Sequence, residues 1–347
     1  ESPFGRNFLY PSIASRSYTV YSGNEQFLFS LLCLGHGEYD VHGVFIEDTP
    51  IENFQDIIYE VYGPGALVTL FPDNVTTAVE VSNIELFGPN EPEYDDWSGP
   101  YIVNGAGTQV NRIEVDYAYP QGLYLANDDG GLDNITVTAE YQYQEIDDNG
   151  NAIGSWTTLI TTSPTMKTTT PQRFTGGLNV TAGRYQVRGR RTNDKNTSHK
   201  AGNKLVWEVL RAFQPSTQDY GEVTMLAVKA RASNNLNDQA ATTIKVDATR
   251  KLPTYNPTTG IWSAPQATRS AVWALCEVFR ANYGARLADT YLDLPSLYQL
   301  DLELTSRGDS FDWVFDTKTT VWEAAKQICR VVRAVPRLSG SQIMAVR

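Results

Sequence analysis

The chain has 347 residues, of which 41% are hydrophobic, 11% aromatic and 20% charged, and its formal net charge is −12. This composition is typical of a folded protein with about two or three packed units and argues against intrinsic disorder. No apolar run approaches the roughly 18 uninterrupted residues that a membrane-spanning helix needs.

The first quarter of the sequence predicts an arm followed by strands. Residues 1–24 are rich in Pro, Ser, Tyr and Gly without a periodic pattern, so we expect an extended arm or linker. The apolar run at 26–34 fits a fully buried strand, and the alternation over 38–46 fits an antiparallel partner. Further strand-like segments follow at 57–61 and 78–86. Residues 25–97 are therefore predicted to form the first part of a β-barrel.

The middle of the sequence predicts a separate β-domain. Short β-type segments are separated by turn residues and occur at 109–117, 135–144, 156–161, 183–190 and 205–212. Asn149-Gly150 follows an alternating strand and precedes Trp156, which is a strong hairpin signal. We predict an inserted β-sandwich-like domain over residues 98–213, with a pattern similar to that of a fibronectin-type module.

The last third predicts a return to the barrel and then an α+β part. Strands expected at 222–231 and 242–246 assign residues 214–252 to the continuing barrel. Helices are expected at 270–283 and at 320–335, the second opened by a capping box of Thr320 and Glu323. Residues 253–347 are thus predicted to be an α+β domain that ends in a strand at 342–346 and is truncated at its C-terminus. Both helices should pack with the 222–246 strands and this last strand.

Charge and cysteine usage limit the chemistry. The first hundred residues carry 16 acidic residues against Arg6 and Arg16, a balance of −14, so the remainder carries +2. A basic stretch at 184–204 is a candidate partner for that acidic surface.

Cys33, Cys276 and Cys329 lie among apolar neighbours without CxxC spacing, which indicates reduced core residues rather than a disulfide or metal site. The chain begins with Glu1 rather than Met, and we expect it to be a piece of a longer protein.

One sequence cluster has the residue types of a metal site. Residue types that bind metals alternate at His36, Glu38, Asp40 and His42, but the neighbouring glycines indicate a turn, and a polar outer strand face is the favoured interpretation. The loop 127–133 has calcium-ligand residue types without EF-hand spacing, so a structural turn is favoured there as well. No cofactor and no metal ligand is assigned.

Catalytic patterns are equally weak. Acidic pairs occur at 47–48, 95–96, 128–129 and 147–148, and two carboxylates are what a glycosidase needs. All but the first pair lie in turn-like contexts, where Asp is ordinary. The sequence has no phosphate loop, dinucleotide fingerprint or GxSxG motif. We assign no catalytic or cofactor-binding residue and expect a non-enzymatic protein.

Several ordered sequence blocks resemble one protein family. The blocks near the start are Pro3-Phe-Gly-Arg6, Tyr10-Pro11, Tyr18-Thr-Val-Tyr21, Gly23-Asn-Glu-Gln26, Gly35-His-Gly-Glu-Tyr-Asp40 and Ile46-Glu-Asp-Thr-Pro-Ile51. The later blocks are Asn256-Pro257 to Trp262, Trp273-Ala-Leu-Cys276, Asn282-Tyr-Gly284, Thr320-Val-Trp-Glu323 through Arg333 to Pro336, Gly340 and Gln342. Together they resemble the hub region of protein J, the tip attachment or host specificity protein of long-tailed bacteriophages. The family tends to have Gln or Glu where this chain has His36 and His42, which further weakens the metal interpretation.

The resemblance implies a fold and a role. It implies a mainly β protein of β-barrel and β-sandwich hub domains, with a smaller C-terminal α+β part that carries two helices. Such hubs form a homotrimer at the tail tip of the virion, close the tail tube and join it to the receptor-binding fibre, and so act in host attachment and genome delivery. The implied partners are other tail-tip and tail-tube proteins and the tape-measure protein. Assembly would take place in the host cytoplasm, and host receptors would be bound by C-terminal regions outside this chain.

Two functions from other classes remain as alternatives. A secreted or cell-surface carbohydrate-binding β-protein would need an exposed aromatic shelf, for which Trp97, Trp156, Trp207 and Trp262 are the candidates. A glycoside hydrolase would need two converging carboxylates with a perturbed pKa in one cleft.

The hub role leads to an expectation about charge. DNA would pass through the channel without specific binding, and a cationic wall would hold its phosphates. We therefore expect part of an acidic set to line the inner wall of the ring, with the basic 184–204 stretch outside it. That set is Glu38, Asp40, Glu47, Asp48, Glu52, Asp56 and Glu60. In the alternative, these carboxylates are scattered over the outer surface for solubility. Stable membrane insertion is not expected.

Overall fold

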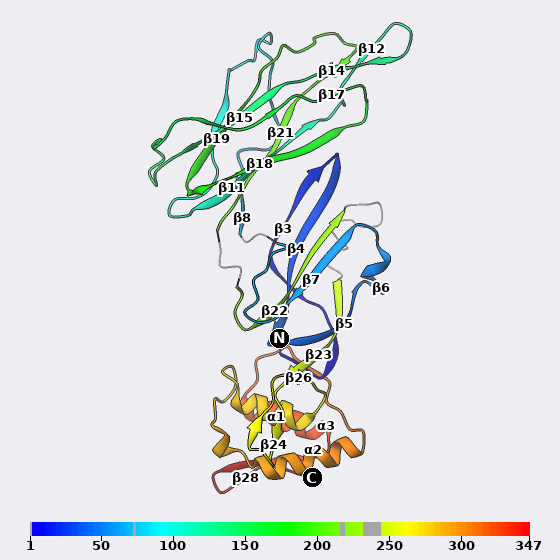
Figure 1. Ribbon diagram of the computed structural model, residues 1–347, viewed down its shortest axis with the longest axis vertical. Coiled ribbons are helices and arrows are strands. Elements are labelled where there is room, and N and C mark those ends of the chain that lie inside the picture. The colour runs from blue at the N-terminus through cyan, green and yellow to red at the C-terminus, as the bar shows by residue number, and fades with distance from the viewer. Residues whose placement is uncertain (1, 72–73, 216–218, 232–243) are drawn as a thin grey trace.

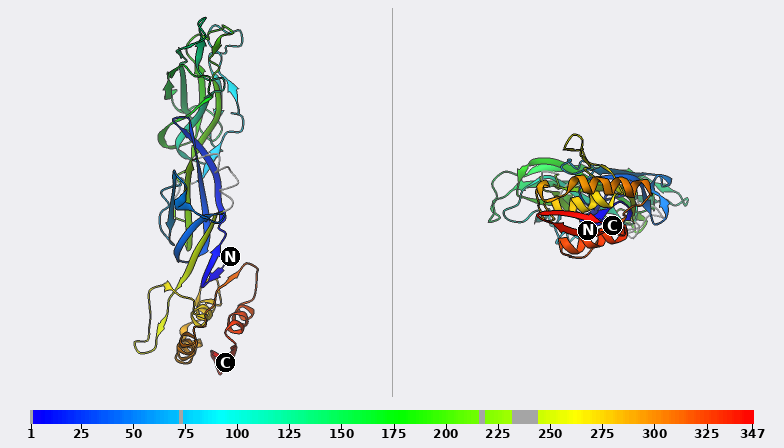
Figure 2. Two further views of the ribbon diagram at one scale, coloured as in Figure 1. Left: turned by 90° about the vertical axis from the view of Figure 1, so that its right-hand side faces the viewer. Right: turned by 90° about the horizontal axis from the view of Figure 1, so that it is seen from below.

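A computed structural model describes residues 2–71, 74–215, 219–231 and 244–347. The molecule is elongated, with helices gathered at one end, strands in the middle, and a second group of strands at the far end (Figure 1). A view turned by 90° shows the same three levels stacked along the long axis (Figure 2). The expected fold class, mainly β with a smaller helical C-terminal part, is confirmed.

The middle unit is built from two antiparallel sheets. One sheet has the order β3 (Ser12–Ser22), β4 (Glu25–His36), β22 (Val223–Arg231) and β7 (Ile57–Tyr62). The other has the order β2 (Arg6–Leu9), β23 (Ile244–Leu252), β5 (Tyr39–Ile46) and β6 (Thr49–Pro50), with β26 (Gln266–Ala267) also on β23 and a short 3-10 helix, Ile51–Asn53, after β6. Leu32, Val44 and Leu226 from these two sheets are buried in one core. Strands from before residue 63 therefore pair with strands from after residue 222. Residues 242 and 243 of the predicted strand lie outside the described residues.

The expectation of an arm at residues 1–24 is wrong, because this segment forms β1 (Ser2–Phe4), β2 and β3. Strand β3 pairs with β4 along its whole length, but its register shifts twice, between Ile13 and Ser15 and between Ser15 and Tyr18. Each such bulge adds a residue and breaks the two-residue alternation by which strands are recognised in a sequence. The expected full burial of the run 26–34 is met only in part, because residues 30–32 and Leu34 are buried whereas residues 26–29 are half-buried.

The far unit, here called the inserted sandwich, consists of two main sheets. The first has the order β18 (Gln172–Gly183), β11 (Val110–Tyr119), β21 (Val206–Phe213) and β8 (Val75–Thr77), with β9 (Ile84–Glu85) also on β21. The second has the order β10 (Ser98–Ile102), β19 (Tyr185–Arg191), β15 (Ala139–Glu145) and β16 (Thr157–Thr162). Short pairings join β12 (Tyr124–Ala126) to β13 (Leu132–Asp133) and β20 (Ala201–Gly202), and β14 (Ile135–Thr136) to β17 (Thr165–Met166).

The two main sheets of the inserted sandwich share one core, in which Val115, Tyr141, Val187 and Trp207 are fully buried. The predicted turn at Asn149-Gly150 is present, and Gly150 has a φ of +88°. The segment 78–86, predicted as a strand of the barrel, belongs here instead: Ala78, Val81 and Leu86 lie in this core, and only its residues Ile84–Glu85 form a strand, β9, which pairs with β21.

The helical unit contains one more helix than expected. Its elements are α1 (Ala271–Arg280), α2 (Leu294–Ser306), α3 (Val321–Val331), the hairpin β28 (Val335–Ser339) and β29 (Gln342–Val346), the pair β24 (Tyr255–Asn256) and β25 (Ile261–Trp262), the 3-10 helix Asp289–Tyr291, and β27 (Trp313–Phe315), which pairs with β1. The Thr320 hydroxyl accepts from the Glu323 N–H at 3.2 Å, as the capping box predicts. Trp273 and Ile328 are buried in one core with Ile343 of β29.

The expected packing of these helices against the 222–246 strands is wrong. Met225 and Leu226 of β22 are buried in cores of the middle unit. Leu252, the last residue of β23, lies in the core of the helical unit. The physical reason is that both faces of β22 are already covered within the middle unit: Leu226 and Val228 are buried in one core, and Met225 and Ala227 are buried in another.

Candidate functional site

The joint between the inserted sandwich and the middle unit contains a buried ion-pair cluster. Arg211 on β21 donates from Nε to Glu114 Oε2 at 2.9 Å and from Nη2 to the Asp116 carboxylate, and all three side chains are at most 7% exposed. Thr175 on β18 also donates to Asp116. Burial raises the pKa of Asp116 to about 6, although Arg211 and Thr175 act to lower it.

The hairpin of β3 and β4 extends from the middle unit to this cluster. The Tyr21 N–H donates to Thr175 Oγ1 at 2.8 Å, and the Arg173 N–H donates to Asn24 Oδ1 at 2.8 Å. Below these bonds, the Tyr18 ring stacks on Phe29 at 4.9 Å and meets Phe213 edge-on at 5.6 Å. Thr175 therefore links a backbone amide of one unit to the buried carboxylate of the other.

One face of the inserted sandwich carries alternating Trp and Arg side chains. The Arg188 guanidinium lies 4.0 Å from the ring centres of both Trp97 and Trp156, and that of Arg190 lies 4.1 Å from Trp97. Arg190 also pairs with Asp96 at 2.8 Å. Each cation over a ring contributes on the order of 0.5–2 kcal/mol. This cation–π ladder joins three chain segments that are far apart in the sequence.

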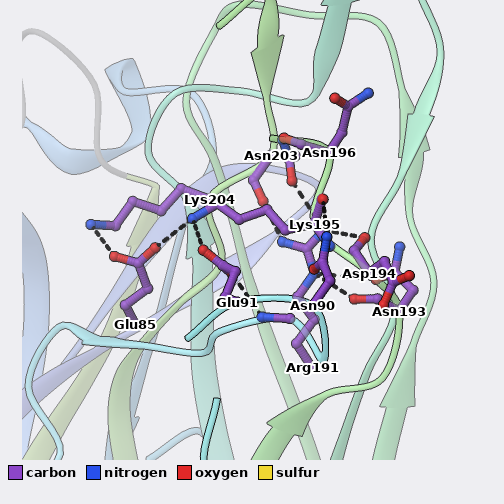
Figure 3. Close-up of polar contacts among 11 residues, drawn as sticks. Glu85, Asn90, Glu91, Arg191, Asn193, Asp194, Lys195, Asn196, Asn203 and Lys204 are labelled. Atoms are coloured by element: carbon purple, nitrogen blue, oxygen red, sulfur yellow. Dashed lines mark hydrogen bonds and ion pairs between the residues drawn. The ribbon is translucent and has the colours of Figure 1, made fainter. Parts of the chain in front are cut away.

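A polar network fixes the loops beside the ladder (Figure 3). Arg191 is 1% exposed and donates to the backbone oxygens of Asn193, Asp194 and Asn203 at 2.8–3.2 Å. Lys195 lies between Glu85 and Glu91, at 3.1 and 2.6 Å (Figure 3).

Glu85 is also 2.6 Å from Lys204. Burial alone raises the pKa of Glu85, but Lys204 and Lys195 hold it below its ordinary value.

The basic 184–204 stretch is therefore engaged within its own unit. Its ion pairs are made with Glu85, Glu91, Asp96, Asp128 and Glu140. Glu85, Glu91 and Asp96 belong to the acidic first hundred residues, so the expected pairing of the basic stretch with that surface is found for these three. The carboxylates at 38–60 are not among its ion-pair partners in the described residues.

A pocket of about 290 Å³ opens next to this network. Its lining comes from residues 84–87, 93–99, Tyr101 and 189–191. Asp96 is bonded to Arg190 and Tyr94. Glu93 and Asp95 are exposed, and neither makes an ion pair with any residue that the structure describes.

The four residues of the candidate metal cluster at 36–42 do not converge on one point. His36 Nδ1 is 3.4 Å from Arg250 Nη2, Glu38 pairs with Lys251 at 2.6 Å, and His42 Nε2 is 2.8 Å from Thr249 Oγ1. Burial, together with the charge of Arg250, lowers the pKa of His36. Asp40 is exposed. Across the described parts of the chain, no group of three or more His, Cys, Asp or Glu side chains is placed to hold a metal ion.

The tryptophans and carboxylates that a carbohydrate-binding protein or a glycoside hydrolase would need make other contacts in this structure. Trp207 is fully buried, and the ring of Trp262 lies 3.7 Å from the Arg280 guanidinium. One member of each acidic pair already has a partner: Asp48 pairs with Lys245, Asp96 with Arg190 and Asp128 with Lys200, and Asp147 accepts from the backbone N–H groups of Asn149 and Asn151.

The three cysteines are free, and Cys276 and Cys329 are buried. Burial raises the pKa of the Cys329 thiol to about 12, and it raises that of Cys276 still further. In the described part of the chain, no helix has the length and apolar character needed to cross a membrane.

Comparison with known families identifies the unit that carries the ladder, the pocket and the Arg211 cluster. Residues 97–216 match the family model described as the FNIII-A domain of tip attachment protein J. From residue 97 on, the inserted sandwich matches a tip attachment protein J domain. The expected family, the phage tail-tip proteins J, and the expected location, the virion tail, are confirmed. No local sequence pattern predicts the cation–π ladder of this FNIII-A domain, because its members Trp97, Trp156, Arg188 and Arg190 lie far apart in the sequence.

Solved structures give distant likenesses. The receptor-binding domain of spike protein P1 from bacteriophage PM2 is 10% identical and covers 41% of this chain and 95% of its own, with a TM-score of 0.24. The P1 stem with its receptor-binding domain is 9% identical and covers 67% and 99%, with a TM-score of 0.26. A structure of T=1 particles derived from infectious bursal virus is 8% identical and covers 72% and 77%, with a TM-score of 0.26. At these TM-scores, no conclusion is drawn from them. No curated protein matches the chain.

Proposed function

We propose that this chain is a non-enzymatic structural component of the phage tail tip, the central hub that closes the tail tube and joins it to the receptor-binding fibre. It acts in host attachment and genome delivery. The match of residues 97–216 to the FNIII-A domain of tip attachment protein J carries this proposal.

The connections between the inserted sandwich and the middle unit are those expected of a structural component that bears mechanical load. The inserted sandwich interrupts the middle unit, since β22 pairs with β4 and β23 with β5 across it. The β3–β4 hairpin adds a further connection through Tyr21, Asn24 and the buried Arg211 cluster. Large interfaces with buried contacts favour a fixed arrangement of units over free domain motion.

The assembled state in this proposal is a homotrimer in contact with other tail-tip and tail-tube proteins and with the tape-measure protein. DNA passes through its channel without specific binding. Within the acidic set, Glu38, Asp48 and Asp56 pair with Lys251, Lys245 and Arg231.

The other members, Asp40, Glu47, Glu52 and Glu60, make no ion pair with described residues. We propose that these four face the lumen.

Electron cryomicroscopy of phage particles that carry this chain tests the proposal. Three copies are expected around the tail axis at the distal end of the tube, closing it, with Asp40 and Glu60 toward the lumen. Density for the chain at another place in the virion, or copies that do not surround the tube axis, would contradict the hub role. A neutral or basic inner wall would contradict the acidic lining alone.

A further inference from the structure

Three arginines of the helical unit expose positive charges that have no partner. Arg330, Arg333 and Arg337 are exposed, and none of them makes an ion pair with a residue that the structure describes. The segment 330–337 contains no acidic residue. In a chain whose net charge is −12, this segment is therefore a local excess of the opposite sign.

The surrounding helical unit does not explain all of these charges. On the same helix, Lys326 has a carboxylate partner, Glu323, at 2.9 Å. The carbonyl end of a helix favours a cation, which accounts for Arg330 in the last turn of α3. It does not account for Arg337, which lies on β28 beyond the helix.

Apolar side chains lie between the arginines. Along residues 333–337 the exposure alternates, since Arg333, Val335 and Arg337 are exposed whereas Ala334 and Pro336 are buried. On β28 itself, Val335 and Arg337 therefore share the face of the strand that is turned away from the core.

The partner strand extends this face. Val346 of β29 lies opposite Val335, and the two side chains are 39% and 65% exposed. Val331 at the end of α3 is 48% exposed. The hairpin lies at the helical end of the molecule, opposite the inserted sandwich, where β28 is labelled in Figure 1. We call the following set the arginine–valine surface: Arg330, Val331, Arg333, Val335, Arg337 and Val346.

The edge of β28 is a poor site for a further strand. Among the described strands, β28 pairs only with β29. Pro336 lies within β28 and has no N–H to donate to a neighbouring strand. A partner at this hairpin is therefore recognised by side chains rather than by addition of a strand.

The combination of charge and apolar surface favours a protein partner. Carboxylates pair with guanidinium groups, and arginine beside apolar surface is typical of protein–protein interfaces. A nucleic acid is disfavoured, because phosphates would leave the valines uncovered and the arginine–valine surface contains no aromatic side chain on which a base could stack. The negative charge of the whole chain would also repel a polyanion.

We propose that the arginine–valine surface binds a segment of a partner protein in which carboxylates alternate with aliphatic side chains. The carboxylates pair with the three guanidinium groups, and the aliphatic side chains cover Val335 and Val346. The proposal is argued from the helical unit alone, so it and the hub role can fail separately.

Isothermal titration calorimetry on the full chain tests this, with a short soluble peptide of alternating glutamate and leucine as the probe. Binding that weakens at high salt is expected. Arg333→Gln with Arg337→Gln should weaken it about fivefold or more, as expected for two surface ion pairs. Val335→Thr, which keeps the β-branched shape, should weaken it about twofold or more. The matched control, Arg16→Gln with Arg286→Gln, removes two exposed arginines outside the surface and should change nothing.

Four results would overturn the proposal. The peptide does not bind, or it binds equally well to the double variant, which would place it elsewhere. Vesicles that contain phosphatidylglycerol, or a DNA duplex, bind in place of the peptide, which would make the surface a membrane or nucleic-acid contact. The chain self-associates and the double variant abolishes this, which would make the surface a contact between copies. Because Arg333 and Arg337 are exposed, the double variant is expected to fold; thermal unfolding verifies this, and Arg337→Gln alone provides a second variant.

Discussion

Replacing Arg211 by Met is expected to destabilise the inserted sandwich by about 3–5 kcal/mol near neutral pH, the usual cost of removing one partner of a buried ion pair. Arg211 is 4% exposed and lies between Glu114 and Asp116, which are 7% and 2% exposed. Without it, Asp116 keeps Thr175 as a hydrogen-bond donor but has no neighbouring cation. Since domains are stable by only about 5–15 kcal/mol, the variant should be close to unfolding.

The loss should shrink as the pH falls. In the native protein, burial raises the pKa of Asp116 to about 6, above the roughly 3.9 of an unfolded chain. The folded state therefore takes up a proton first as the pH falls, and this contribution to stability is fully present below about 3.9 and lost as the pH rises through about 6. Removing Arg211 removes an influence that lowers this pKa, so Asp116 should become neutral at a higher pH and the deficit should be smaller near pH 5.

Urea unfolding followed by tryptophan fluorescence measures this difference, because Trp207 is fully buried in the same unit. Arg112→Met is the matched control: Arg112 pairs with Glu114 from the surface at 40% exposure, so its loss should cost at most about 1 kcal/mol. Arg211→Met with Asp116→Leu should recover much of the stability, since an apolar pair of similar size replaces buried charges. A deficit for Arg211→Met below about 1 kcal/mol, or one that grows on acidification, would refute the reasoning.

Three further outcomes are expected. Trp97→Ala should destabilise the inserted sandwich by about 1–4 kcal/mol in urea unfolding, because both guanidinium groups on its ring lose a cation–π contact. Ser270→Ala should cost about 1 kcal/mol in thermal unfolding of the helical unit, because the hydroxyl caps α1 by accepting from two backbone amides. An aromatic disulfide reagent should label Cys33 before Cys276 and Cys329, because burial raises the pKa of both of these thiols; equal labelling rates in the folded protein would contradict this.

The sequence predicted the elements whose signals are local. Helices α1 and α3 carry continuous apolar faces and begin at Ser270 and Thr320, whose hydroxyls cap them as expected. Helix α2 was missed although it carries local signals as well: its buried leucines are three or four residues apart, Asp293 caps it and Pro295 lies in its first turn. Strand β3 was missed because two bulges interrupt its alternation.

The pocket and the cation–π ladder could not be predicted, because they depend on contacts between distant segments. Trp97 and Arg188 are brought together by the pairing of β10 with β19, whose register no local pattern specifies. The same holds for Arg211, which reads as an ordinary strand residue until β21 lies beside β11. Of the charge pattern, only the net acidic excess of the first hundred residues could be read from the sequence.

That sum acquires a structural meaning from the topology of the middle unit. The first hundred residues carry the acidic excess, and the strands that return after the inserted sandwich bring Lys245, Lys251 and Arg231 to Asp48, Glu38 and Asp56. In the reverse sense, Arg6 pairs with Asp247 at 2.5 Å. Segments separated by more than a hundred residues are thus complementary in charge as well as in strand pairing. Part of the acidic excess serves to match the two halves of one unit, and the carboxylates left over are those that a partner or a channel would meet.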